Sequence, residues 1–135
     1  MSKFYCDKNN IGEEGCEYLA SSMEMMDSLK KICLENNNIG DRGAIALAKS
    51  LEENDTLLSL YLENNKIGRD GAVALGEMLS NKFKLSKLNL TNNQIGDEGF
   101  SCISQGLMEV ETLRNLILGE TGITASSIPS LNKCL

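Results

Sequence analysis

The chain has 135 residues, of which 41% are apolar and 24% charged, a composition typical of one soluble globular domain. Thirteen basic residues stand against 19 acidic ones, and the net charge of −6 argues against nucleic acid or an anionic membrane as the main partner. The sequence contains no histidine, which removes the commonest general base and the commonest metal ligand.

The first residues and the cysteines favour a cytoplasmic protein. No apolar segment of the kind that directs secretion opens the sequence, and charged residues or asparagines interrupt every apolar run before it reaches the length of a membrane span. The five cysteines are an odd number without a Cys-x-x-Cys pair, a pattern that favours reduced thiols over a disulfide framework or a zinc site. We therefore expect a cytoplasmic location, with neither nucleic acid nor a membrane as partner.

One unit of 28 residues recurs along the whole chain. Its clearest marker is an isoleucine that returns without insertion at Ile11, Ile39, Ile67, Ile95 and Ile123. The third copy shows the full pattern, which reads Leu57-x-x-Leu60-x-Leu62-x-x-Asn65-x-Ile67. This period predicts a single domain of five repeats, which occupy residues 1–28, 29–56, 57–84, 85–112 and 113–135.

Each repeat is expected to begin with a short strand. Leu60 and Leu62 point to one side of such a strand and into the core, whereas Tyr61 and Glu63 point to the other side. The asparagine that follows is expected to bond to its own turn and to the neighbouring repeat, so that a buried ladder forms. The ladder positions are Asn9, Asn37, Asn65 and Asn93, and Thr121 breaks the ladder in the fifth repeat.

A helix is expected after each strand, because apolar residues then recur at the i and i+4 spacing of one helix face. A row of small residues predicts close approach of adjacent helices, and it consists of Ala20, Ala48, Gly76 and Ser104. Glycines are expected to supply backbone freedom at the turn into each helix, at Gly12, Gly40, Gly68 and Gly96. The only proline, Pro129, falls in the first turn of the last predicted helix.

The repeated pattern resembles the leucine-rich repeat, and its period resembles the ribonuclease-inhibitor-like class of that family. This resemblance covers the whole chain and implies an α/β solenoid. In such a fold, parallel strands line the concave face of a short right-handed horseshoe arc and helices cover the convex face. Spacing leads to the same curvature, since paired strands lie about 4.8 Å apart and packed helices about 8–10 Å apart.

Repeats of this class occur in ribonuclease inhibitor, in the sensing ends of NOD-like receptors and in Ran GTPase-activating proteins, and they resemble segments of actin-capping regulators such as tropomodulin. All of these proteins act by binding a protein, and only the GTPase activators change a reaction rate. The resemblance therefore implies a protein-binding module that is not an enzyme. A GTPase-activating or other enzyme-regulating domain is the alternative, which a panel of GTPases would test through accelerated hydrolysis.

The outward-facing positions of the predicted strands form the candidate binding surface. The row through Lys31 is mostly basic, the row through Tyr61 is apolar, and the row through Glu35 is acidic at its N-terminal end. Cys33 is expected to be exposed there as a contact residue. The predicted partner-binding residues are Lys3, Tyr5, Asp7, Lys31, Cys33, Glu35, Ser59, Tyr61, Glu63, Lys87, Asn89, Thr91, Asn115 and Ile117. The same pattern also fits a sheet that cross-strand neighbours stabilise with no concave partner.

Missing residues argue against calcium binding, phosphate binding and nucleophilic catalysis. The segment from Asp7 opens like a calcium-binding loop, but Ile11 and Tyr18 stand at the fifth and twelfth places, where ligands are required. No glycine-rich phosphate-binding motif follows a strand. Cys33 has no histidine partner to make it a nucleophile. The sequence therefore predicts no catalytic residue, no cofactor and no metal site.

Neither end of the repeat array carries the polar cap that solenoids normally need. This pattern fits two expectations, which are a piece of a longer repeat protein or a self-associating scaffold whose exposed ends pair as a homodimer or filament. A particle size that grows with concentration in sedimentation would support the pairing.

Overall fold

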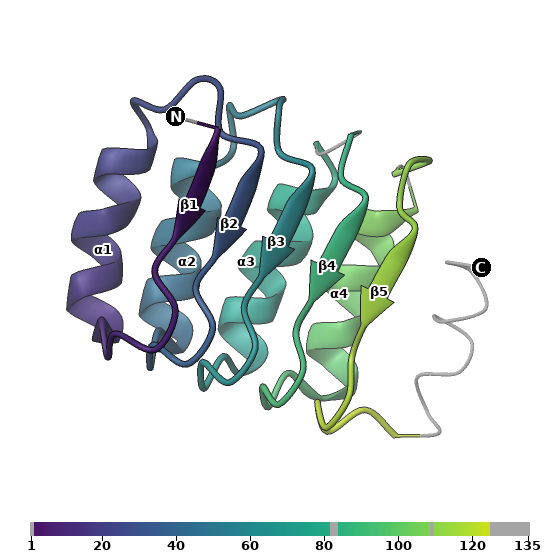
Figure 1. The fold of residues 1–135 in the computed structure, drawn as a ribbon. Coiled ribbons are helices and arrows are strands. Elements are labelled where there is room, and N and C mark those ends of the chain that lie inside the picture. The colour runs from purple at the N-terminus through teal and green to yellow at the C-terminus, as the bar shows by residue number, and fades with distance from the viewer. Residues whose placement is uncertain (1, 82–83, 109, 125–135) are drawn as a thin grey trace.

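The computed structural model describes residues 2–81, 84–108 and 110–124. Strands and helices alternate in the order β1 (Lys3–Tyr5), α1 (Gly12–Met23), β2 (Lys31–Cys33), α2 (Gly40–Ser50), β3 (Ser59–Tyr61), α3 (Arg69–Leu79), β4 (Lys87–Asn89), α4 (Gly96–Leu107) and β5 (Asn115–Ile117). The strands form one parallel sheet in sequential order, and α1 to α4 stand behind it (Figure 1). This arrangement confirms the predicted α/β solenoid.

The 28-residue period sets the register of the sheet. Leu60 in β3 lies opposite Ile32 in β2 and Leu88 in β4, each 28 residues away along the chain. All three side chains are buried between the sheet and the helices, where Phe100 of α4 is the only fully buried aromatic residue of the described chain. Equal repeat length therefore keeps every leucine of the pattern on the core side, since a slip by one residue would turn it outward.

The predicted asparagine ladder is confirmed. Asn65 is fully buried, and its Oδ1 accepts a bond of 2.8 Å from the backbone N–H of Asn37. Its Nδ2 donates to backbone carbonyls of the preceding repeat and of its own repeat. Equivalent bonds join Asn9 to Asn37 and Asn65 to Asn93. At the corresponding place of the fifth repeat, the hydroxyl of Thr121 bonds within its own repeat.

The predicted close approach of adjacent helices is confirmed between α3 and α4. A Cβ atom added at Gly76 would lie 2.5 Å from the backbone carbonyl oxygen of Cys102. A Cβ atom added at Gly106 would in turn lie 2.2 Å from the carbonyl oxygen of Gly76. Only glycine fits at these two crossing points, because the backbones themselves are in contact.

The turns into the helices use two backbone conformations. Gly40 has a φ of 64°, and Gly12 and Gly96 share this left-handed region, as expected for the predicted turn glycines. Gly68 also lies at the turn into its helix but is extended, with a φ of −106°, so it does not need the left-handed region there. The physical reason is a later helix start, since α3 begins at Arg69 and leaves Gly68 outside the helix.

Some expectations fall on residues that the structure does not describe. The predicted fifth helix with Pro129 lies outside the described residues, as does Cys134. Within the described part of the chain, Cys6, Cys16, Cys33 and Cys102 are free thiols. No helix among the described residues has both the length and the apolar character that crossing a membrane requires.

Candidate binding surface

The concave face brings the predicted surface residues together. The register places them in rows across the sheet, so that Cys33 in β2 lies between Tyr5 in β1 and Tyr61 in β3. Thirteen of the fourteen predicted residues are at least partly exposed, and Cys33 is the exception. Sequence spacing alone therefore located this surface, although it misjudged the depth of one side chain.

Cys33 is only 5% exposed, which corrects the prediction of an exposed thiol. Its small side chain lies on an inner strand with a tyrosine on each side, and the larger neighbours shield it. Burial, together with the nearby carboxylate of Glu35, raises the pKa of Cys33 to about 11. The thiol therefore keeps its proton at neutral pH and does not supply a nucleophile.

Two tyrosines and a lysine form an ordered group in the middle of the face, which we call the tyrosine–lysine patch. The Nζ atom of Lys31 lies 5.1 Å from the ring centroid of Tyr5 and 5.2 Å from that of Tyr61. Both distances are within the range of cation–π attraction. Tyr5 as a residue remains 57% exposed. Lys31 thus holds two aromatic side chains in place while leaving them available for contact.

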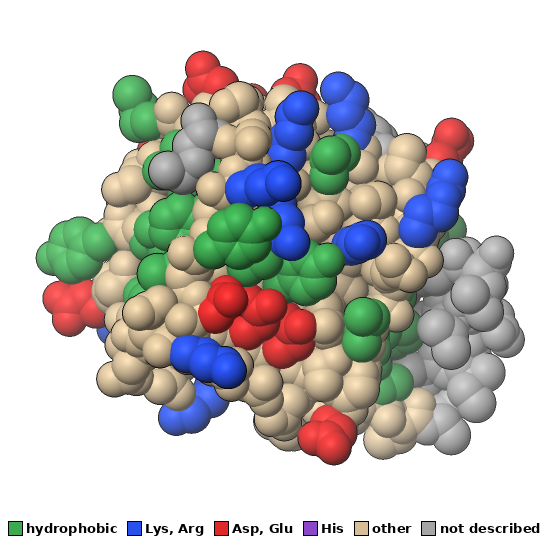
Figure 2. Space-filling view, in the orientation of Figure 1, with side chains coloured by type: hydrophobic (Ala, Val, Ile, Leu, Met, Phe, Trp, Pro, Cys, Tyr) green, Lys and Arg blue, Asp and Glu red, His purple; other side chains and the backbone are tan. Residues whose placement is uncertain are grey.

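Three carboxyl groups, those of Asp7, Glu35 and Glu63, lie next to this patch and form the acidic cluster. Figure 2 shows acidic side chains gathered near the middle of this face, with apolar and basic side chains beside them. Burial of Glu35 and its hydrogen bond with Asp7 raise the pKa of Glu35 to about 7. Burial likewise raises the pKa of Glu63. The Oε2 atoms of Glu35 and Glu63 are buried, and neither has a hydrogen-bond partner among the described residues.

The C-terminal part of the face carries a hollow in place of the acidic cluster. Its volume is about 200 Å³, and it is lined by Tyr61, Lys87, Leu88, Asn89, Asn115 and Ile117. Ile117 is 46% exposed at its edge, which is unusual for a large apolar side chain on a sheet face. The hollow is smaller than the usual site for a free ligand, and its size suits one apolar side chain of a protein partner.

Asn89 connects the hollow with the acidic cluster. Its Oδ1 accepts a bond of 2.7 Å from the hydroxyl of Thr91, and its Nδ2 donates to the carboxylate of Glu63. The polar groups of Asn89 and Thr91 are therefore satisfied within the surface, unlike those of Glu35. The face accordingly divides into an N-terminal half with unsatisfied carboxylate oxygens and a C-terminal half with a hollow that contains no carboxylate.

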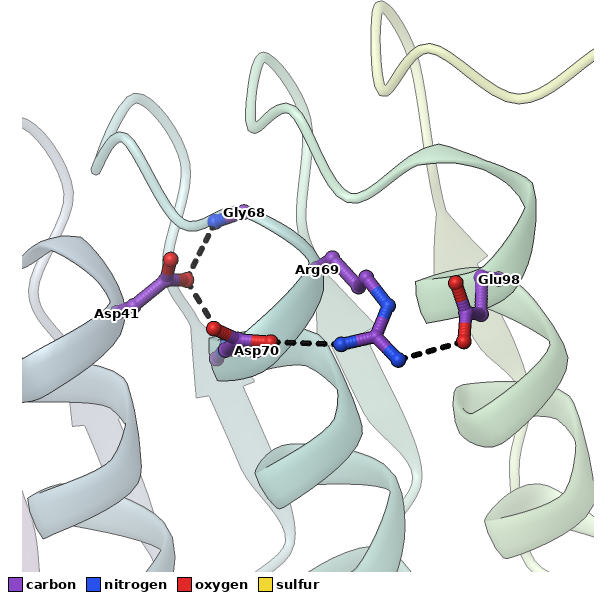
Figure 3. A network of polar contacts seen from close by, with 6 residues as sticks. Asp41, Gly68, Arg69, Asp70 and Glu98 are labelled. Atoms are coloured by element: carbon purple, nitrogen blue, oxygen red, sulfur yellow. Dashed lines mark hydrogen bonds and ion pairs between the residues drawn. The ribbon is translucent and has the colours of Figure 1, made fainter.

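Sequence reasoning missed the role of Asp41, which lies in the first turn of α2 and holds the start of α3 (Figure 3). Its Oδ1 accepts a bond of 2.7 Å from the N–H of Gly68 and a second bond from the first turn of α3. Beside it, the exposed Arg69 pairs with Asp70 at 2.8 Å and with Glu98 at 2.6 Å. No residue of its own repeat caps α3 by a side-chain bond, so the cap comes from the preceding repeat. The signal in the sequence was the acidic residue directly after the turn glycine.

A parallel-stranded solenoid of stacked strand–helix units belongs to a class of repeat domains with extended surfaces for binding. The sequence pattern of the family described as Leucine Rich repeat matches residues 28–48, 53–76 and 81–104, which together make up just over half of the chain. The chain belongs to the leucine-rich repeat family. Membership of this family fits a binding module.

One solved structure shows how far the likeness extends. The chain is similar to the structure titled Leiomodin-1 Actin-Binding Site 2, with a TM-score of 0.79 and 26% sequence identity. The match covers 99% of this chain and 79% of the leiomodin chain. No curated protein matches the chain. The whole described solenoid therefore has a structural counterpart in a domain whose title names a binding site for a protein.

Proposed function

We propose that the chain is a protein-recognition module whose partner occupies the concave face. The observation that carries this proposal is the exposed tyrosine–lysine patch beside a hollow of about 200 Å³ with Ile117 at its edge. Exposed tyrosines that are already ordered lose little conformational entropy on binding, and such residues dominate many interfaces. A neighbouring hollow gives one anchor side chain of the partner a place to be buried.

The charges around the patch add specificity. Lys3 and Lys87 are exposed at one edge of the face, and Asp7 is exposed at the other. A partner whose charges are arranged in the opposite order would be oriented by these residues, because like charges brought together are penalised. The partner is therefore expected to present basic groups to the acidic cluster and acidic groups to the lysine edge.

Actin is the first partner to test. The leiomodin structure that this chain resembles carries an actin-binding title, and the repeats also resemble those of actin-capping regulators such as tropomodulin. The likeness to leiomodin extends over nearly the whole chain, so a comparable surface is available. The free thiols of the described chain support the cytoplasmic location in which actin would be met.

The experiment measures the affinity of purified chain for monomeric actin. The native protein is compared with a Tyr5→Ala, Tyr61→Ala double variant and with Tyr18→Ala, a matched control whose side chain is 72% exposed on α1. We expect the double variant to bind at least about tenfold more weakly, as loss of interface tyrosines commonly does. Tyr18→Ala should bind like the native protein, and all three should have similar thermal stability.

The outcomes test the identity of the partner and the location of the binding surface separately. Weakening by Tyr18→Ala with no effect of the double variant would move the site to the helices and refute the concave face. If native protein does not bind actin, actin is rejected. The same three proteins are then compared for capture of partners from lysate of the source organism, where loss of a captured protein in the double variant alone again identifies the concave face.

Self-association through the ends of the repeat array is kept as the second candidate function, as the sequence pattern suggests. Sedimentation across a wide concentration range tests this prediction. A constant monomeric size would refute it without affecting the concave-face proposal.

A further inference from the structure

Side chains from two repeats converge beside the tyrosine–lysine patch. One carboxylate oxygen of Asp7, the Sγ atom of Cys33 and one carboxylate oxygen of Glu35 all lie within 4.8 Å of one another. Asp7 and Glu35 are 28 residues apart, which places them side by side on neighbouring repeats. Cys33 lies two residues before Glu35, so its side chain points to the same face of the sheet.

We propose that Asp7, Cys33 and Glu35 form a binding site for a thiophilic divalent cation, with Zn²⁺ as the ion that fits best. Zn²⁺ takes cysteine sulfur and carboxylate oxygen together, usually with four ligands at about 2.0–2.3 Å. Ca²⁺ and Mg²⁺ prefer ligand sets made of oxygen alone, so a thiol among the donors selects against them. Three protein donors leave one coordination position for water or for a group of a partner.

A second observation points to a ligand at this place. The Oε2 atom of Glu35 is buried and has no hydrogen-bond partner within the described residues. Cys33 beside it is only 5% exposed, so the donor atoms lie in a partly dehydrated position where an unsatisfied carboxylate oxygen is costly. A bound cation would satisfy the thiol and the carboxylates at once.

The surroundings supply excess negative charge. The Oε2 atoms of Glu35 and Glu63 are buried without a partner in the described structure, and the charge of Glu63 acts on both Glu35 and Cys33. Lys31 is the nearby cation that opposes this field, but its Nζ atom lies over the tyrosine rings. Three carboxyl groups against one ammonium group therefore leave a local attraction for a divalent cation.

The binding step exchanges protons for the metal ion. A zinc–sulfur bond forms as the S–H bond of Cys33 breaks, and the thiol proton passes to the buffer. Titration in buffers of different ionisation enthalpy measures how many protons are released for each ion bound.

The test titrates ZnCl₂ into the full chain, kept reduced, by isothermal calorimetry. A parallel titration with Cd²⁺ follows the ultraviolet charge-transfer band of a metal–thiolate bond. We expect one site per chain, and we expect Cys33→Ser to abolish the cadmium band and weaken zinc binding by more than about tenfold. Cys102→Ser is the matched control, because Cys102 is a partly exposed thiol on α4, outside the cluster.

Asp7→Asn keeps the test decisive if Cys33→Ser does not fold. Asp7 is exposed, so its substitution leaves the core intact, and it should also weaken zinc binding by more than about tenfold. The proposal is overturned if the native chain binds no zinc, if Cys102→Ser removes the cadmium band, or if millimolar Ca²⁺ displaces the zinc. None of these measurements requires a protein partner, so their outcome is independent of the proposed function.

Discussion

The two sides of the sheet follow the 28-residue period with different strictness. On the core side, Leu60 and Leu88 stand opposite each other with 0% and 1% exposure, and one chemical type serves every repeat. On the concave side, the same two strands place Tyr61 opposite Asn89, and the chemistry changes from one repeat to the next. Stability thus depends on the side that repeats, and recognition has room to develop on the side that varies.

The two sides also differ in how completely their buried polar groups are hydrogen-bonded. Asn65, on the core side, has its amide oxygen and nitrogen bonded to backbone groups of two repeats, its own and the preceding one. Glu35, on the concave side, keeps one oxygen buried without a partner among the described residues. A polar group that is fully bonded stabilises the fold, whereas one left unsatisfied destabilises it until a ligand arrives.

The largest effect is expected from the ladder. Asn65→Ala removes the acceptor for the backbone N–H of Asn37 and the donor for two backbone carbonyls, all in the dry interior. Each orphaned group costs about 1–3 kcal/mol, so the free energy of unfolding should fall by about 3 kcal/mol or more. Urea unfolding measures the loss. Asn115→Ala, at an exposed position of β5, should change stability little, and an equal loss in both variants would contradict the ladder's special role.

A smaller loss is expected where the helices cross. Gly76→Ala places a methyl group 2.5 Å from the backbone oxygen of Cys102, so α3 and α4 must separate. Overpacking of this kind costs about 1–3 kcal/mol, and the better helix propensity of alanine offsets only part of it. Thermal unfolding should detect a net loss of about 2 kcal/mol. Gly119→Ala, whose added methyl group would lie 3.5 Å from its nearest neighbour, is the control; a stabilised Gly76→Ala would show that the helices can part freely.

On the concave side, removing a buried polar group should stabilise the folded chain at high pH, in contrast to the losses expected on the core side. Because the pKa of Glu35 is raised to about 7 in the folded chain from its usual 4.5, the folded state holds a proton that the unfolded state has already released. The stability of the native protein should therefore fall as the pH rises from about 4.5 to 7, by about 1–2 kcal/mol after allowance for partial exposure. Glu35→Gln should remove most of this fall, and the raised pKa of the buried Glu63 should leave a smaller one.

Urea unfolding at pH 5 and at pH 8 measures how strongly the stability of the native chain and that of Glu35→Gln depend on pH. Glu77→Gln, at an exposed position on α3, controls for the general effect of removing one negative charge. If Glu35→Gln keeps the native pH dependence, Glu35 is not the group that destabilises the folded chain. A stabilised Glu35→Gln variant at pH 8 would show that the concave side maintains its acidic cluster at the expense of stability.

The core side was predictable from the sequence because one local rule is repeated five times. The alternation around Leu60 fixes its face, and equal repeat length fixes its neighbours in the sheet. The concave rows follow from the same rule, which is why the predicted surface residues do lie together. Their chemistry does not follow from it, since the depth of Cys33 depends on the size of side chains from two other repeats.

The convergence of Asp7, Cys33 and Glu35 was hidden for a related reason. Sequence motifs for metals rely on ligands that are close along the chain, whereas here a donor from one repeat meets two donors from the next.

Positive φ values explain why asparagine recurs after the strands, a feature that the spacing alone did not resolve. Asn36, Asn64 and Asn92 adopt φ values of 56–60° just after their strands, a conformation that asparagine tolerates better than most residues. Asparagine therefore recurs at these positions because of the turn conformation as well as because of their exposure on the surface.

The smallest effect is expected at the helix starts, where Asp41 of α2 caps α3 in the next repeat. Its carboxylate accepts bonds of 2.7 and 2.8 Å from the N–H groups of Gly68 and Gly71, which α3 cannot satisfy itself. Asp41→Ala should lower the free energy of unfolding by about 1 kcal/mol, the usual effect of losing a helix cap. Asp70→Ala removes an acid from the same turn that pairs only with exposed Arg69, and it should have less effect. Equal losses would mean that charge near the helix start matters and the cross-repeat bonds do not. A larger loss for Asp41→Ala would show that adjacent repeats are joined by specific bonds at the helix starts as well as by the ladder inside.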